Sequence, residues 1–101
     1  MVIYERLAAA LRAQRPVALA TVIEGIGLGA KLLVDADGEV TGSLGNVDLD
    51  RVVARDALGE LAAGITSTRH YGPRGEARER DVKVFIESYV LPPRMIVFGA
   101  V

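Results

Sequence analysis

The chain has no cysteine, which excludes disulfide bonds, thiolate metal ligands and a thiol nucleophile within its 101 residues. It has no excess of either charge, because 12 basic and 13 acidic side chains leave a net charge of -1, unlike the basic footprint of nucleic-acid-binding proteins. It also has no apolar run of the roughly 18 residues that span a bilayer, and no continuously apolar signal peptide. These absences predict a cytoplasmic protein that binds neither nucleic acid nor membrane.

Apolar residues are abundant instead: half of the chain is hydrophobic and the mean hydropathy is +0.29. A chain of this length forms one domain with a modest core. We therefore expect part of the apolar surface to face a second subunit or domain, and we expect a homo-oligomer.

The first half of the chain predicts a helix followed by three strands. Apolar residues at helical spacing predict an N-terminal helix that ends before Pro16 and packs on a sheet; a membrane-surface helix is the alternative. The continuously apolar run 16–23 predicts a strand at the middle of the sheet. The glycine-rich segment 25–29 that follows this strand is predicted to be a flexible connection or, alternatively, a loop that binds phosphate. Asp35-Ala36-Asp37-Gly38 then predicts the turn of a hairpin between two short strands.

The second half predicts a longer helix and two more strands. Asn46 or Asp48 caps a helix with a broad apolar face, and Gly64 ends it. Residues 65–72 read as a partly exposed strand, and 82–91 as a strand with one buried face. The fold class expected is therefore α/β (α+β), with a mixed sheet of about five strands, an N-terminal helix and one longer central helix.

The last ten residues differ in character from the rest. Pro92-Pro93 forces an extended break, and the apolar RMIVFGAV that follows is how a dinucleotide-binding unit begins. A final edge or swapped strand is the alternative. We expect a domain over 1–91, with 92–101 as linker and first strand of a missing or truncated dinucleotide-type domain.

No catalytic or metal-binding group is predicted. His70, the one histidine, has no Ser or Cys partner at a recognisable spacing and is interpreted as a surface residue. Asp48 and Asp50 stand at a helix start, where capping explains them better than a metal site does. We expect no catalysis by this chain.

The segment GSLGN, residues 42–46, is the candidate binding loop. Gly42 and Gly45 permit close approach of the backbone, Ser43 offers a hydroxyl, and a helix start just beyond presents unpaired amide groups that favour an anion such as phosphate. A plain strand-to-helix turn has the same composition. From the residues alone, both readings stay open.

The order of several segments resembles the N-terminal domain of the XdhC/CoxI family. These are LRAQRPVALATVIE, GAKLLVDADGEVTGSLG, the acidic-led helix, VKVFIESYVLPP and RMIVFGA, which together cover nearly the whole chain. The resemblance implies an accessory factor for molybdenum hydroxylases such as xanthine dehydrogenase and carbon monoxide dehydrogenase. It implies handling of the molybdenum cofactor (molybdopterin) and contact with the apoenzyme, and in the family a dinucleotide-type domain usually follows.

The resemblance also implies the site residues. The positions that match are Gly29, Ala30 and Lys31, then Gly42, Ser43, Leu44 and Gly45, a surface for a pterin phosphate with Lys31 as counter-charge. In the family this segment continues to a cysteine, whereas here Asn46, Val47 and Asp48 follow, so the chain resembles a divergent member without the family cysteines. Lys31, Gly42, Ser43, Gly45 and Asn46 are the predicted cofactor-binding residues.

Two functions follow as hypotheses. The first is a maturation domain that binds the cofactor or the apoenzyme of a molybdenum hydroxylase without catalysis of its own. The second is a structural dimerisation or interaction module that has lost its ligand and works through a second domain or subunit. An enzyme is the weakest reading, because cysteine and any acid-base cluster are absent.

Overall fold

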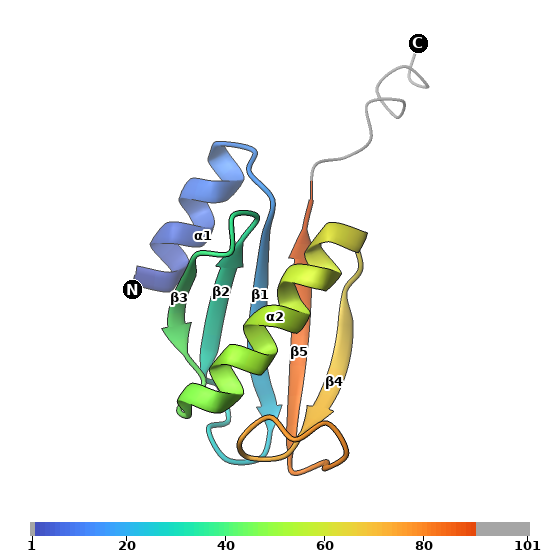
Figure 1. The fold of residues 1–101 in the computed structure, drawn as a ribbon. Helices are drawn as coiled ribbons and strands as arrows, with labels where there is room; N and C mark the ends of the chain where they lie inside the picture. The colour runs from blue at the N-terminus through green and yellow to red at the C-terminus, as the bar shows by residue number, and fades with distance from the viewer. Residues whose placement is uncertain (1, 91–101) are drawn as a thin grey trace.

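A computed structural model describes residues 2–90 of the chain, which form two helices and one five-stranded sheet (Figure 1). The predicted linker and strand at 92–101 lie outside the described residues. In chain order the elements are α1 (Val2–Arg12), β1 (Val17–Glu24), β2 (Lys31–Asp35), β3 (Val40–Ser43), α2 (Val47–Ala63), β4 (Ser67–Tyr71) and β5 (Val82–Tyr89). The predicted α+β class, five strands, N-terminal helix and longer central helix are all confirmed.

The sheet has the order β3-β2-β1-β5-β4, so the predicted central strand is indeed its middle member. Every neighbouring pair is antiparallel, so the mixed sheet predicted from the sequence is wrong in this respect. The reason lies in the connections. Short loops reverse the chain between β1, β2 and β3, and α2 returns it along the sheet, so that β4 starts a second hairpin (Figure 1).

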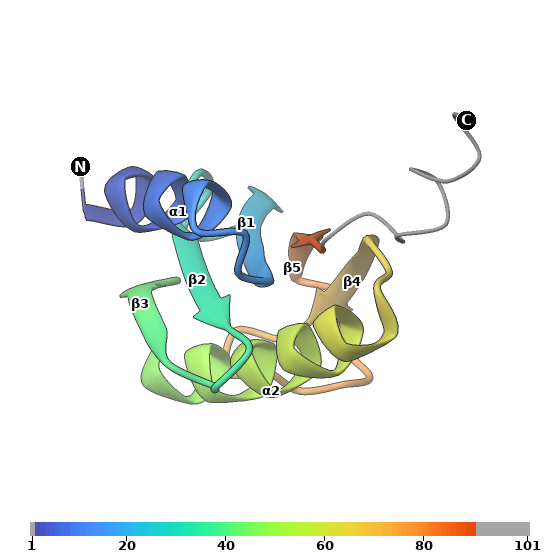
Figure 2. The same cartoon turned by 90° about the horizontal axis from the view of Figure 1, so that it is seen from above.

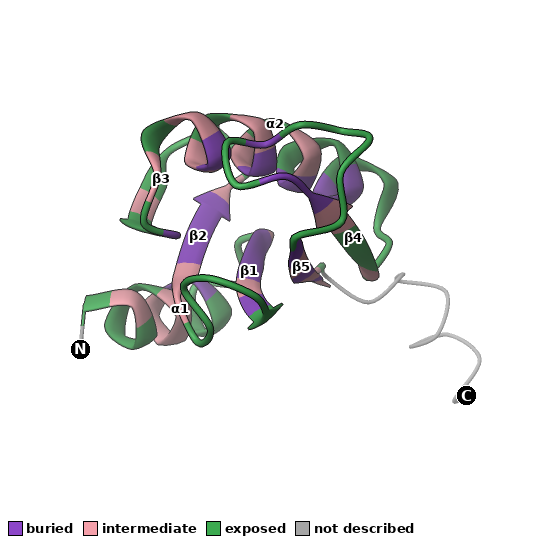
Figure 3. Cartoon of the chain, turned by 90° about the horizontal axis from the view of Figure 1, so that it is seen from below, coloured by how far each residue is buried: buried purple, intermediate pink, exposed green. Residues whose placement is uncertain are grey.

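The larger core lies between the sheet and α2. Side chains alternate along β1 and β5, so one face presents Ala18, Ala20 and Val22 beside Val84 and Ile86, all of them buried. The apolar stripe of α2 covers this face with Leu49, Val53, Ala57 and Leu61. Figure 3 shows the buried residues on the central strands and on the side of α2 that faces them. This burial holds the helix and sheet in a fixed relation.

Both predicted ends of α2 are confirmed. The Asn46 side chain caps the first turn, as the sequence indicates for an Asn at this place. Gly64 ends the helix in a left-handed conformation, with φ of 71°. The position of the N-terminal cap matters for function because it fixes where the segment 42–46 lies.

The smaller helix α1 packs on the opposite face of the sheet, over β1, β2 and β3 (Figure 2). Its core is small: Ala10 lies with Val17, Leu19 and Leu33, and Ile3 and Leu7 pack around them. In Figure 2, no helix of the described part covers the β4–β5 half of this face. Within residues 2–90, no helix has the length and apolar character needed to cross a membrane.

Candidate functional site

The segment 42–46 joins the end of β3 to the start of α2 at one end of the molecule. The β1–β2 loop lies against it, because a Cβ added to Gly27 would come 3.0 Å from the carbonyl oxygen of Leu44. Gly42 and Gly45 both have left-handed φ angles, of 91° and 105°. The two glycine-rich loops singled out in the sequence therefore meet in space.

Asp50 organises the middle of this segment. Its carboxylate accepts the Ser43 hydroxyl and the Leu44 N–H, each at 2.6 Å, and the Ser43 Oγ in turn accepts the Gly45 N–H at 3.0 Å. Asp50 sits in the first turn of α2, so these bonds tie the loop to the helix. The hydroxyl of Ser43 thus has both a donor and an acceptor within the protein.

Asn46 completes the turn as the helix cap. Its Oδ1 accepts the N–H groups of Asp48 and Leu49, at 2.9 and 3.1 Å. Asp48 and Asp50 place negative charge in the same first turn, where the helix dipole favours it. An anion bound here would compete with Asn46 and meet two carboxylates. Phosphate binding at residues 42–46 remains a prediction, and the hydrogen bonds by themselves account for a strand-to-helix turn.

Lys31 lies close to this segment in the sheet but points away from it. It stands opposite Ser43 in the β2–β3 register, and such cross-strand Cβ atoms lie about 5 Å apart. Its ammonium nitrogen, however, lies 3.1 Å from the Thr21 hydroxyl on β1. The structure therefore brings Lys31 next to Ser43 by position, with the charge directed across the sheet. Gly29 and Ala30 precede it in the loop, where their N–H groups bond to Val22 and Gly27.

Large apolar side chains are exposed at the same end of the molecule. Ile26 and Leu28 in the β1–β2 loop are 83% and 70% exposed, and Val47 at the start of α2 is 79% exposed. The loop itself is held by the Gly29 N–H bond to Val22 and by the Ala30 N–H bond to Gly27. These three side chains form the apolar end of the molecule: an ordered turn presents Ile26 and Leu28 to solvent, and the first turn of α2 presents Val47.

A polar cluster between α2 and β4 was missed in the sequence. Glu60 is only 2% exposed, and it accepts hydrogen bonds from Ser67, at 2.7 Å, and from the Arg69 guanidinium. The hydrogen bond to Glu60 raises the pKa of Arg69. One signal was available: Glu60 follows Val53 and Ala57 at helical spacing, so it is a charged residue within the buried stripe. The cluster ties the edge strand to the helix.

Tyr71 belongs to the same cluster and predicts a pH effect. Burial raises its pKa, and so does the 2.8 Å hydrogen bond that its hydroxyl donates to Asp56. The neutral phenol is therefore favoured in the folded state, and its stabilisation is complete below about pH 10 and lost as pH rises toward the folded pKa. In Tyr71→Phe we expect stability to fall less steeply above about pH 10 than in the unaltered chain, measured by urea unfolding across pH.

The exposed Tyr4 on α1 supplies the control for this prediction. Tyr4→Phe should keep the alkaline dependence of the unaltered chain. Tyr71→Phe should also lose about 1 kcal/mol at pH 7, since Asp56 loses one donor. Equal alkaline slopes in the unaltered chain and both variants would contradict the role given to Tyr71.

The remaining titratable candidates form no recognisable centre. His70 lies half-buried on the edge strand β4. The Asp48 carboxylate contacts the Arg51 guanidinium at 3.4 Å, and the Asp50 carboxylate accepts the hydrogen bond from Ser43 within the turn. Within residues 2–90, no group of three or more His, Asp or Glu side chains could hold a metal ion.

The fold and the turn geometry define a small α+β domain with its glycine-rich loops gathered at one end. The XdhC and CoxI family matches residues 10–72, which include both loops, α2 and β4. Because the match covers more than half of the chain, the protein belongs to the XdhC and CoxI family, as the sequence resemblance predicted. Membership implies an accessory role for molybdenum hydroxylases in general. Comparison with curated proteins gives no match.

Proposed function

We propose that the chain is a maturation domain for a molybdenum hydroxylase, which binds the apoenzyme or the molybdenum cofactor and catalyses no reaction itself. The observation that carries the proposal is the family match over residues 10–72. This range includes the apolar end and the segment 42–46, which lie side by side. The proposal places the working surface at this end of the molecule.

The apolar end supports apoenzyme binding. A partner that covers exposed apolar side chains gains binding free energy of about 25 cal/mol for each Å² of apolar surface buried. Ile26, Leu28 and Val47 are exposed enough to contribute in this way. The ordered loop presents them without a large ordering cost on binding. A complementary apolar patch on the apoenzyme is the partner that this chemistry suits.

Cofactor binding is proposed at the five residues predicted from the sequence, namely Lys31, Gly42, Ser43, Gly45 and Asn46. The Lys31 ammonium supplies positive charge on the sheet beside the turn, in register with Ser43. A pterin phosphate would gain a charge-assisted contact if Lys31 left Thr21. These 101 residues contain no thiol, so any sulfur transferred to the cofactor comes from outside them.

A dimerisation module is the second candidate. The half of the sheet that α1 leaves uncovered carries the partly buried Phe85 on β5 beside the exposed Thr68 on β4. A second subunit or a following domain placed there would cover these side chains. A strictly monomeric mass at tens of micromolar would count against the homo-oligomer.

Two binding experiments test the proposed function. In the first, the apoenzyme of a molybdenum hydroxylase from the same organism is titrated with the chain, and with an Ile26→Ser, Leu28→Ser double variant. We expect affinity to fall about tenfold or more, since two apolar contacts are lost. Ile65→Ser at the far end of α2 is the matched control, because Ile65 is also exposed.

In the second experiment, the molybdenum cofactor is titrated with the chain and with Lys31→Met. The control is Lys83→Met, which removes a half-buried lysine from β5. Loss of binding in Lys31→Met alone would support the predicted site. If the chain binds the apoenzyme but not the cofactor, it is a docking domain. If it binds neither of them, the proposal is refuted.

A further inference from the structure

The helix α1 is attached to the sheet by a small core. Of its 11 residues only Ala10 is buried, whereas five residues of α2 are buried. The apolar side chains Val2, Tyr4 and Leu11 of α1 are exposed. The helix therefore buries little apolar area against the strands beneath it, and the hydrophobic effect holds it weakly.

A cavity of about 270 Å³ lies beneath α1, between the helix and the β2–β3 hairpin. Ala9 and Ala10 of the helix line it, together with Val17 of β1 and Leu33 of β2. The alanines leave this space where larger side chains would reach the sheet. Atoms that line a cavity lack packing partners on that side, so the dispersion contacts between α1 and the sheet are reduced here.

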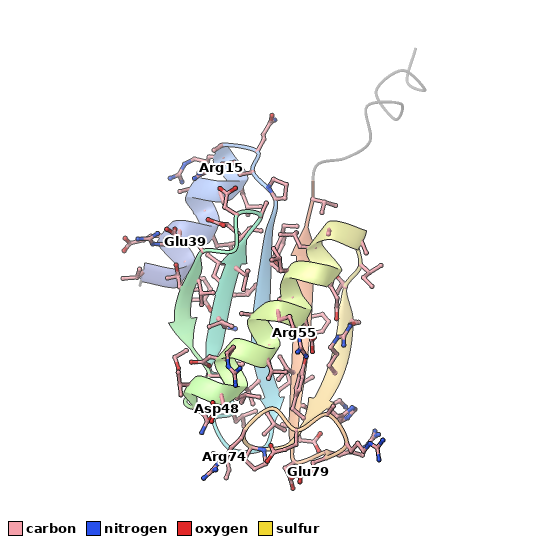
Figure 4. The ribbon with its side chains drawn as sticks, viewed as in Figure 1. Arg15, Glu39, Asp48, Arg55, Arg74 and Glu79 are labelled. Atoms are coloured by element: carbon pink, nitrogen blue, oxygen red, sulfur yellow. The ribbon has the colours of Figure 1, made fainter. Side chains whose placement is uncertain are left out.

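An exposed ion pair and a strained turn also belong to this attachment. The Arg6 Nη1 atom lies 3.2 Å from Oε1 of Glu39 in the hairpin, and both side chains are more than half exposed. Figure 4 shows Glu39 beside α1. Ion pairs exposed in this way contribute little to stability. After the helix, Gln14 has a left-handed φ of 57°, which is unfavourable for a residue other than glycine. Neither feature holds the helix strongly.

The rest of the fold does not depend on α1. Among the described residues, the larger core between the sheet and α2 contains none from α1, and the four strand pairings do not involve the helix. A helix of 11 residues is marginal by itself in water, so α1 loses its helical form when it leaves the sheet. Departure of α1 is therefore a local unfolding step that leaves the remaining domain intact.

We propose that α1 is a lid on the sheet, which opens by local unfolding while the five strands and α2 stay folded. Opening uncovers Val17, Leu19 and Leu33, which lie beneath the helix. They share a face of the sheet with Phe85 of β5, which lies in the half that α1 leaves uncovered (Figure 2). The open state thus presents one apolar face across β2, β1 and β5, and the closed helix withholds the part on β1 and β2. This inference goes beyond the proposed function and does not depend on binding of the apoenzyme or the cofactor.

The chain has no cysteine, so one reporter thiol can be placed under each helix in turn. Leu19→Cys places the thiol beneath α1, and Leu32→Cys, on the neighbouring strand, places it beneath α2. An aromatic disulfide reagent is added in excess to each full chain, and the exposed Ile65→Cys gives the rate of a free thiol. We expect the Leu19→Cys thiol to react at least about a hundredfold faster than the Leu32→Cys thiol, which only global unfolding exposes. Equal rates for these two thiols would overturn the inference.

Two further substitutions in the Leu19→Cys chain test whether the helix controls access. Ala9→Leu fills the cavity under α1 and should slow the reaction about tenfold, because it adds apolar contacts to the closed state. Arg6→Gln removes the ion pair and should speed the reaction about threefold. Arg51→Gln is the matched control, because it removes an exposed ion pair within α2 and should leave the rate unchanged. If neither Ala9→Leu nor Arg6→Gln alters the rate, the reagent reaches residue 19 without movement of α1 and the inference fails.

Hydrogen exchange of the unaltered chain supplies a measurement without substitutions, since Leu19→Cys itself removes buried apolar atoms. We expect the hydrogen-bonded N–H groups of α1 to share one protection factor, at least about a hundredfold smaller than those of α2 and β1. Protection of α1 equal to that of α2 would overturn the inference. Protection that declines gradually toward Val2 would show fraying of a helix end instead of the opening of a lid, and would overturn it as well.

Discussion

Replacing Arg69 with methionine is expected to lower the free energy of unfolding by about 3 kcal/mol. The reason is the partner left behind: the Glu60 side chain is 1% exposed, and once the guanidinium is removed the Ser67 hydroxyl is left to donate to it without any positive charge nearby on β4. A buried carboxylate without its cation is costly. Urea unfolding at pH 7, followed by circular dichroism, measures the change.

Replacing the other partner of the pair, Glu60, should lower the free energy of unfolding much less. In Glu60→Gln the Arg69 guanidinium is still solvated, because its side chain is 44% exposed, and it still contacts the Asp56 carboxylate at 3.6 Å. We therefore expect the free energy of unfolding to fall by about 1 kcal/mol. Arg55→Met is the matched control, because Arg55 contacts the same Asp56 from the surface and should contribute less than about 1 kcal/mol. Equal losses in Arg69→Met and Arg55→Met would contradict the importance of the buried pair.

The second large effect is expected at Gly42. Both Gly42 and Gly45 have left-handed φ angles, so an alanine at either position costs about 1–2 kcal/mol in backbone strain. At Gly42 the added Cβ would also lie 2.5 Å from Ile3 Cδ1 and 2.6 Å from the Lys31 carbonyl oxygen. Overpacking of this kind adds about 1–3 kcal/mol.

Gly45→Ala is therefore the control for Gly42→Ala, since nothing lies within 4 Å of its added Cβ. The expected difference between the two variants is about 2 kcal/mol in the free energy of unfolding, measured by the same urea titration. Equal stabilities would mean that α1 moves away without cost. The two variants also bear on function. Close packing against α1 explains why position 42 needs a glycine, whereas no packing contact explains the glycine at position 45.

The sequence allowed most of the fold to be predicted, because each element carried a local signal. The apolar run of β1, the Asp35 to Gly38 turn, the Asn46 cap and the Gly64 stop each act within a few residues. The antiparallel order was not predicted as such. Strand direction depends on how α2 crosses the sheet, which no local pattern determines.

The site was predicted less completely, for a physical reason. Glycines, a serine and a helix start indicate an anion site and a capped turn equally well, and the choice depends on where the Asp50 carboxylate points. The Glu60–Arg69 pair joins residues from different elements, and the cavity depends on what the alanines of α1 leave empty. Such features come from tertiary packing.

The pairing of β1 with β5 has a consequence for biosynthesis. These two strands form the middle of the sheet, yet about 60 residues separate them in the chain, and Val17 pairs with Tyr89. On the ribosome, the first three strands and α2 emerge while one edge of β1 is still without its neighbour. Long-range pairing of this kind folds slowly and exposes apolar edges meanwhile. The nascent chain is thus most vulnerable to aggregation just before the residues of β5 leave the exit tunnel.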